Sequence, residues 1–351
     1  DILDGRDLRR RRDEAMAILG IESLIYGVED VAANVRFWTD FGLQPVPARR
    51  AGQSEFEVAS GSRVVVRPND DPSLPGANFD GQGLREAIWG VDTAESLERL
   101  VAGLATDREV RRDADGTAHF HADDGTPLGL RVWAKRPVVS QPDPVNAPGC
   151  IQRLNLHRKW RTRALPKTIN HVVYFSDDYV RDIEFYRQRL GFRITDHFRD
   201  VGAFARADGT NEHHSVFLFT TDLPITQGKR GYIHASFGVE DIDELMLGVE
   251  IMERAGWIPD RHARGGLSRH RASSALYFYT RQPCGGEAEY HADTDYLDDH
   301  WIPRVWSWHF GSLLWSSQTP PHLKTAGPDW DVQLDPGLKS LEASRARLAR
   351  R

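Results

Sequence analysis

The strongest structural signal in this sequence is that it repeats itself. Residues 21–30 read IESLIYGVED and residues 169–178 read INHVVYFSDD, and each segment continues into a helical pattern that ends in an aromatic pair and a glycine, Gly42 or Gly191. β-Branched and aromatic residues favour a strand in the first part, and apolar residues at helical spacing favour a helix in the second. Each glycine occupies the place of a helix C-cap. The chain is therefore expected to use one strand-helix unit more than once.

A second pair of segments follows the same pattern. Residues 87–104 (AIWGVDTAESLERLVAGL) and 235–252 (ASFGVEDIDELMLGVEIM) each read as a strand followed by an amphipathic helix with acidic residues in its first turn. Further strands are expected after these helices, at 128–133 and 275–280. We therefore predict an α+β fold of four β-α-β-rich modules, paired into an N-terminal and a C-terminal half.

Prolines mark the point where the two halves separate. Residues 137–149 contain four prolines and few large apolar side chains, which suits an extended connection. The chain is again loop-like after about residue 316, although its last residues, LKSLEASRARLARR, are able to form a short basic helix. The predicted division is an N-terminal domain at 1–136, a linker at 137–165, a C-terminal domain at 166–316 and a tail at 317–351.

Composition narrows the classes of function. The length of 351 residues fits about two domains, and a formal charge of -6 argues against general affinity for nucleic acid or anionic membranes. The sequence has no run of about 18 apolar residues, so no membrane span is expected. With only two cysteines, Cys150 and Cys284, a disulfide framework is not expected, and the cytoplasm is the predicted location.

Three polar residues on predicted strands have the chemistry of metal ligands. His171 opens the strand NHVVYF, His234 lies in YIHASF and Glu289 lies in EAEYHAD. Two imidazoles and one carboxylate suit a non-haem Fe(II) site that keeps open positions. A single histidine on a strand is more often a hydrogen-bonded surface residue, and the chain has 14 histidines. The donor types alone therefore leave both interpretations open.

The N-terminal half offers an internal comparison. Aligning the repeats places Ser23, approximately Glu86 and approximately Arg131 opposite the three candidate ligands. Serine, glutamate and arginine do not form the same site, and an arginine there would repel a cation. We therefore expect a non-catalytic copy of the fold that contributes to oligomer contacts.

A longer pattern in the C-terminal half supports the metal interpretation. It reads His270-RASSALY-Phe278-Tyr279-TRQ-Pro283-Cys284-Gly285-GEA-Glu289. This pattern resembles the signature of the type I extradiol dioxygenases of the vicinal oxygen chelate superfamily, in which the tyrosine follows the histidine by nine positions and the glutamate follows the tyrosine by ten. Ser268 and Gln282 depart from the family pattern, and neither is a candidate functional residue. The resemblance in fold covers most of residues 20–315, whereas the specific motifs lie between 169 and 306.

The resemblance implies both a fold and a reaction. The fold would be four βαβββ modules forming two tandem vicinal-oxygen-chelate domains, with the active site in the C-terminal half. Fe(II), with Mn(II) as an acceptable second ion, would bind to His171, His234 and Glu289, and the spacing from the P-x-G turn selects Glu289 over Glu287. The reaction would be the opening of a catechol-type ring by O2 to a semialdehyde, in aromatic hydrocarbon catabolism, by a homo-oligomer.

The resemblance also implies three catalytic residues. The pair His213-His214 matches the segment that carries the family's acid-base histidine. The small polar residue and strand that follow select His214, and His213 would then point to the other face if the strand has begun there. His270 and Tyr279 match the two groups that hydrogen-bond the substrate oxygens.

Two other functions stay open at this point. A 4-hydroxyphenylpyruvate dioxygenase-like enzyme would share the length, the duplicated fold and the ligand types, but would lack the set of His214, His270 and Tyr279. A metal-free binding or resistance protein of the same superfamily would lack the ligand triad. The identity of the catechol and the position of cleavage, proximal or distal to a substituent, are also open.

The segment after Glu289 resembles the family's C-terminal lid. In it Arg304 or His300 is a candidate contact for an acidic substituent on the ring, and a solvated lid is the equal alternative. Four tryptophans are expected to pack together and close the pocket: Trp301, Trp306, Trp308 and Trp315.

Overall fold

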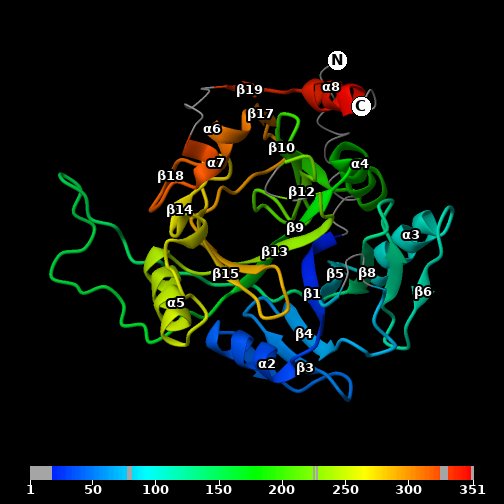
Figure 1. The fold of residues 1–351 in the computed structure, drawn as a ribbon, viewed down its shortest axis with the longest axis horizontal. Helices are drawn as coiled ribbons and strands as arrows, with labels where there is room; N and C mark the ends of the chain where they lie inside the picture. The colour runs from blue at the N-terminus through cyan, green and yellow to red at the C-terminus, as the bar shows by residue number, and fades with distance from the viewer. Residues whose placement is uncertain (1–17, 77–80, 224–225, 227, 325–330, 349–351) are drawn as a thin grey trace.

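The chain folds as four copies of one module, each a strand, a helix and three further strands (Figure 1). The structure, a computed structural model, describes residues 18–76, 81–223, 226, 228–324 and 331–348. The first module comprises β1 (Ile18–Val28), α2 (Val31–Asp40), β2 (Gln44–Val46), β3 (Ser54–Glu57) and β4 (Arg63–Pro68). The second comprises β5 (Gly83–Val91), α3 (Ala94–Leu104), β6 (Arg111–Arg112), β7 (Ala118–His121) and β8 (Pro127–Val132).

The C-terminal half repeats this order. Its first module comprises β9 (Thr168–Ser176), α4 (Tyr179–Leu190), β10 (Arg193–Phe198), β11 (Gly202–Arg206) and β12 (Val216–Thr220). Its second comprises β13 (Gly231–Gly238), α5 (Ile242–Arg254), the short 3-10 helix η2 (Ala263–Gly265), β14 (Ser268–Arg269), β15 (Leu276–Arg281) and β16 (Glu287–Ala292). Four βαβββ modules were predicted, and that prediction is confirmed.

The modules join through their first strands. Within each module the first strand pairs in parallel with the last, as β1 does with β4 and β9 with β12. The first strands of neighbouring modules pair antiparallel, β1 with β5 and β9 with β13. One sheet therefore has the order β2-β3-β4-β1-β5-β8-β7-β6, and the other runs β18-β14-β15-β16-β13-β9-β12-β11-β10-β17-β19.

Local sequence signals explain where the main helices begin and end. Asp30, Thr93, Asp178 and Asp241 cap the four module helices, each accepting a hydrogen bond from a backbone N–H three residues further on. Gly191 ends α4 in the left-handed region, with φ of 75°, as the sequence predicts.

The tail after β16 adds to the second sheet. It contains β17 (Arg304–Trp306), α6 (Trp308–Ser312), β18 (Trp315–Ser316), α7 (Pro321–Lys324), β19 (Val332–Leu334) and α8 (Lys339–Leu348). β17 pairs with β10 and β19 pairs with β17, while α8 is the helix expected from the basic C-terminal sequence. The arginine-rich start of the chain lies outside the described residues. None of the helices in the described ranges combines the length and the apolar character that a membrane span requires.

The two halves share one apolar core. The ring of Phe41, at the end of α2, stacks on Tyr290 of β16 with centroids 3.9 Å apart, and the Tyr290 hydroxyl donates to the Phe41 carbonyl at 2.6 Å. Trp38 packs on Phe237 of β13, with centroids 5.3 Å apart. These contacts press α2 against the two strands that carry His234 and Glu289, on the sheet face opposite to those side chains.

Candidate metal centre

The three candidate ligands come from three adjacent strands of the C-terminal sheet. His171 lies on β9, His234 on β13 and Glu289 on β16, and β13 lies between the other two. Ser236 of β13 pairs with His171 on one side and with Glu289 on the other. His234 precedes Ser236 by two residues and so shares its face. The ladder of the sheet thus brings the three side chains together.

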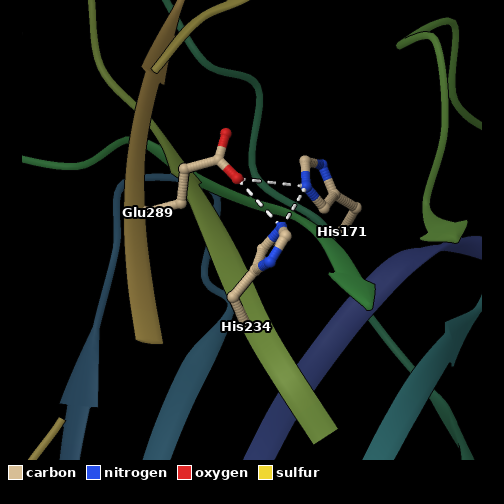
Figure 2. Close-up of side chains that lie close together, drawn as sticks. All are labelled: His171, His234 and Glu289. Atoms are coloured by element: carbon tan, nitrogen blue, oxygen red, sulfur yellow. Dashed lines mark hydrogen bonds and ion pairs between the residues drawn. The ribbon is translucent and has the colours of Figure 1, made fainter. Parts of the chain in front are cut away.

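The ligand atoms converge on one point, and Figure 2 shows the side chains pointing toward one another. His171 Nε2 lies 3.3 Å from His234 Nε2. Glu289 Oε2 lies 3.5 Å from His171 Nε2 and 3.0 Å from His234 Nε2. Two atoms bound at about 2.1 Å to one ion, at roughly 90–110° to each other, lie about 3.0–3.4 Å apart. Among the described residues, this is the only group of three such side chains with ligand atoms this close.

The charges around these atoms fit a metal cation. Burial alone would raise the pKa of Glu289, but the imidazoles of His171 and His234 beside it hold that pKa well below its usual range. Burial lowers the pKa of His171, which favours the neutral imidazole. In the described part of the chain, no lysine or arginine lines the surrounding cavity, and Glu289 Oε2 receives no hydrogen bond of acceptable geometry. A buried carboxylate facing two imidazole nitrogens, without a protein cation, suits a divalent ion.

His214 lies directly beside the candidate ligands. Its ring stacks on the ring of His171, with centroids 4.0 Å apart, and burial holds the pKa of His214 well below its usual value. β12 begins only at Val216, so strand alternation does not apply to this pair. The condition under which His213 was expected to point to the other face is therefore not met, and both histidines line the cavity.

His213 instead connects His214 to a buried carboxylate. His213 Nδ1 lies 3.1 Å from His214 Nδ1, and His213 Nε2 lies 3.3 Å from Asp196 Oδ2. Asp196 is fixed in turn, since its carboxylate accepts from Trp306 Nε1 and from the backbone N–H of Arg304, each at 2.8 Å. Sequence reasoning missed Asp196, because no motif connects a residue of β10 with the loop before β12.

His270 and Tyr279 line the same cavity as the ligands. The Nδ1–H of His270 donates to the Ser312 carbonyl at 2.5 Å, and burial lowers the pKa of His270 to about 4. Its ring stacks on Tyr277, with centroids 3.9 Å apart. Tyr279 stands opposite Glu289 in the β15–β16 ladder, and its ring centroid lies 4.9 Å from that of His234. All six residues singled out in the sequence therefore line one cavity of about 490 Å³.

The N-terminal half has a different set of residues at the equivalent positions. Ile88, the counterpart of Ser236, pairs with Ser23 on one side and Gly129 on the other. The counterpart of the third ligand is thus Gly129, and the alignment with Arg131 is wrong by two residues. The connections between these strands differ in length between the halves, so sequence spacing does not reproduce the register. A Cβ on Gly129 would meet Ile88 Cδ1 at 2.3 Å, so a ligand side chain at this position would require the Ile88 side chain to move.

A larger cavity of about 780 Å³ lies in this N-terminal half. Ser23 and Glu86 line it, and Glu86 Oε1 lies 2.7 Å from His119 Nδ1. Among the described residues this cavity holds no group of three converging metal-ligand atoms. Donor chemistry, rather than size, therefore assigns the candidate site to the C-terminal half.

Expectations about the lid are only partly met. Of the four tryptophans, Trp308 lines the cavity, whereas Trp315 is 41% exposed on β18. Neither Arg304 nor His300 belongs to the cavity lining, and the Arg304 guanidinium lies over the Trp301 ring, 3.8 Å from its centroid. Within the described residues, neither side chain therefore borders the cavity of the candidate ligands.

Comparisons with known proteins agree with the geometry. Residues 168–268 match the family model described as Glyoxalase/Bleomycin resistance protein/Dioxygenase superfamily. The chain is 32% identical over 304 residues to Metapyrocatechase 2 of Cupriavidus necator, an alignment that covers 85% of this chain and 86% of that protein. It is 26% identical over 313 residues to the iron-dependent extradiol dioxygenase of Rhodococcus jostii (strain RHA1), covering 82% of this chain and 94% of that protein. Among solved structures, the halotolerant catechol dioxygenase BphC matches with a TM-score of 0.67 at 18% identity, over 92% of this chain and 100% of that chain.

Proposed function

The chain belongs to the extradiol ring-cleaving dioxygenases of the vicinal oxygen chelate superfamily, and we propose that it opens catechol-type rings with O2 at an Fe(II) ion held by His171, His234 and Glu289. A ring carbon–carbon bond beside the two hydroxyl-bearing carbons is broken, and both atoms of O2 enter the semialdehyde product. The supporting observation is the convergence of two imidazole nitrogens and a carboxylate oxygen, 3.0 to 3.5 Å apart, on the wall of a cavity.

The ion and the protein contribute different chemistry. Bound Fe(II) supplies Lewis acidity toward the two catechol oxygens and one-electron redox chemistry toward O2. Two imidazoles and a carboxylate leave positions open for both reactants. The same donors accept Mn(II), which is the second ion to test.

We propose that His214 transfers a proton during the reaction and that His213 holds the His214 ring in position. The Asp196 carboxylate accepts from His213 Nε2–H, so His213 Nδ1 is an acceptor. The Nδ1–H of His214 then donates to His213, which leaves a lone pair on His214 Nε2. Because burial favours the neutral imidazole, His214 Nε2 takes a proton from a catechol hydroxyl and returns it to oxygen when the O–O bond breaks.

His270 and Tyr279 orient the substrate in this proposal. Since His270 Nδ1–H is used by the Ser312 carbonyl, its Nε2 is an acceptor for a catechol hydroxyl. The Tyr279 hydroxyl donates to a substrate oxygen. An acceptor and a donor that line one cavity would distinguish the two oxygens of the ring.

The test is direct. After anaerobic loading with Fe(II), the protein should convert catechols into yellow ring-fission products with one O2 consumed per ring opened. Oxygen-18 gas should label both newly introduced oxygen positions. Metal-free and Zn(II)-loaded protein are the controls, because Zn(II) has no redox chemistry. A loaded protein that consumes no O2 with any catechol of a broad panel would contradict the proposal.

The relatives and the cavity disfavour the two alternatives. A 4-hydroxyphenylpyruvate dioxygenase-like enzyme lacks the set of His214, His270 and Tyr279, which here lines the cavity together with the triad. A metal-free binding protein has no need for a buried carboxylate among histidines.

We further propose that the protein is a homo-oligomer and that the arm, residues 137–165, contributes to its contacts. Figure 1 shows this long segment between β8 and β9 standing away from the modules. Its large apolar side chains are exposed, with Trp160 at 89%, Ile151 at 72% and Leu154 at 71%. Exposed apolar groups gathered on one segment mark an interaction site. A cytoplasmic location also belongs to this proposal, since both cysteines are free thiols.

Replacing Trp160 and Leu154 together with serine is expected to shift the protein toward smaller species, because apolar burial between copies is lost. Light scattering after gel filtration measures the mass. Trp315→Ser, at a partly exposed position on β18, is the matched control and should leave the mass unchanged. A wild-type protein that is monomeric at micromolar concentration, or a double variant of unchanged mass, would exclude the arm as an interface.

A further inference from the structure

The cavity of the N-terminal half occupies the same place in its sheet as the cavity of the metal ligands does in the other sheet. Arg67 of β4 corresponds to Phe219 of β12, since each pairs with the residue four positions after Ser23 or His171. Both side chains line their cavities. A guanidinium in the N-terminal half thus stands where the C-terminal half has an aromatic ring.

Arg67 is a half-buried cation whose hydrogen-bond acceptors are neutral. Its Nε–H donates to Gln53 Oε1 at 2.8 Å, and its Nη1 donates to the Ser73 hydroxyl at 3.3 Å. Among the residues that the structure describes, no carboxylate forms an ion pair with this guanidinium. Burial lowers the pKa of Arg67, and the charge of Arg50, which also lines the cavity, lowers it further. A bound anion would favour the charged form of Arg67 and reduce the repulsion between the two arginines.

The other arginines of the lining already face carboxylates. The pairs are Arg49 with Glu22, Arg111 with Asp113, and Arg131 with Asp115. Within the described lining, these pairs leave Arg67 and Arg50 as the cations that a bound anion would balance.

Beside Arg67 the cavity has an apolar floor, which we define as Ile25, Val65, Leu74 and Ile88. Three of these residues form a buried cluster, Leu74 packs against it, and all four line the cavity. Val65 precedes Arg67 by two residues on β4, so both side chains point to the same face of the sheet. A ligand whose anionic group reaches Arg67 would therefore place the rest of its surface on apolar side chains.

Acidic side chains of the lining limit the charge of such a ligand. Glu86 and Asp113 line the cavity, and His119 lies between them, with its Nδ1 2.7 Å from Glu86 Oε1 and its Nε2 3.2 Å from Asp113 Oδ2. Burial alone would lower the pKa of His119, but the two carboxylates raise it above its usual value. The imidazolium offsets only one of the two negative charges. A doubly charged ligand would therefore be repelled, whereas a single carboxylate suits the two arginines.

We propose that the N-terminal cavity is a second ligand site, for a small molecule with one carboxylate and a compact apolar body such as an aromatic ring. The carboxylate binds the Arg67 guanidinium, Arg50 adds positive charge, and the ring lies on the apolar floor. The inference is independent of the proposed reaction, because none of these residues lines the cavity of the metal ligands.

Calorimetry with metal-free protein tests the site, with benzoate as the probe and benzamide as its uncharged counterpart. Benzoate should bind at one site per chain. Benzamide should bind at least about 10-fold more weakly, because it lacks the charge that Arg67 pairs with. Arg67→Gln should weaken benzoate binding by about 10- to 100-fold, and Arg50→Gln should weaken it less. Arg112→Gln is the matched control, because Arg112 pairs with Glu98 and does not line the cavity.

Two further variants and probes keep the outcome decisive. Arg67→Lys keeps the charge and should retain most of the benzoate binding. If Arg67→Gln unfolds at a clearly lower temperature than the wild type, the result for Arg50→Gln decides, since that side chain is exposed. Benzoate held in the cavity of the metal ligands would be insensitive to both changes, and such insensitivity would exclude the site. Equal binding of benzoate and benzamide, or no benzoate binding at millimolar concentration, would also exclude it. Inorganic phosphate that binds as tightly as benzoate would overturn the ligand class, because phosphate makes no use of the apolar floor.

Discussion

Alanine at His171, His234 or Glu289 is expected to abolish tight iron binding and ring cleavage while the protein stays folded. Each change removes one of three donors whose atoms lie 3.0 to 3.5 Å apart, so the remaining two no longer enclose the ion. Loss of a residue that merely orients a ligand costs about 10- to 100-fold in affinity, and loss of a ligand should cost more than about 100-fold. Metal analysis after gel filtration and O2 uptake are the measurements.

The fold should survive these changes for a physical reason. The ladder hydrogen bonds of β9, β13 and β16 hold the backbone, and the N-terminal half forms the same ladder with Ser23, Glu86 and Gly129 at the equivalent positions. Far-ultraviolet circular dichroism should therefore be unchanged. Glu287→Ala, on the same face of β16 as Glu289, is the control and should keep its iron. A full complement of iron in any of the three ligand variants would remove that residue from the ligand set.

The second large effect is expected at His214. His214→Ala should lower kcat by about 10²–10⁴-fold, the usual range for a general acid or base, with little change in iron content or in catechol affinity. Proton transfer at His214 Nε2 is lost, whereas the metal ligands and the rest of the cavity lining stay in place. Stopped-flow absorbance with anaerobically bound catechol, followed by mixing with O2, measures the step. Uncoupled O2 consumption should appear as released hydrogen peroxide.

His213 is not a neutral control for this experiment, because its Nδ1 lies 3.1 Å from His214 Nδ1. His213→Ala should cost about 10- to 100-fold in kcat through misorientation of His214, and His213→Asn should recover part of the loss by keeping a hydrogen-bonding group. His197→Gln is the better control, since His197 is buried beside Asp335 and does not line the cavity. If His214→Ala fails to retain iron, or if His197 and His214 variants behave alike, the acid-base assignment is wrong.

The fold was predictable because its signals are local. A capping side chain such as Asp178 and the change from strand to helix periodicity recur in every module, and the left-handed Gly191 ends α4. Each of these signals acts within a few residues. The pairing partners of the strands depend instead on hydrogen bonds between distant segments. The sequence alignment therefore placed Arg131 at the position that Gly129 occupies in the structure. The loops differ in length between the two halves, so the register of the strands follows only from their hydrogen bonds.

The candidate site was predictable where a motif carried it. The spacing from His270 to Glu289 pointed to the right strand positions, and the cavity brings these residues together with His214. Nothing in the sequence connects Asp196 with His213, because their approach depends on how β10 meets the loop before β12. The sequence also did not reveal the phenylalanines that line the cavity, such as Phe204 and Phe217, because phenylalanines of a core and of a cavity look alike in a sequence.

The stacking of Phe41 on Tyr290 makes the C-terminal half depend on the N-terminal half. Tyr290 lies between Glu289 and His291 on β16 and points away from them, into the aromatic side chains of the N-terminal half. The N-terminal half therefore serves as a cover for this face of the C-terminal sheet. A cover needs an aromatic surface but no metal ligands, and Gly129 stands where a third ligand would be. Deleting the N-terminal half would expose the reverse side of the strands that carry His234 and Glu289 to water.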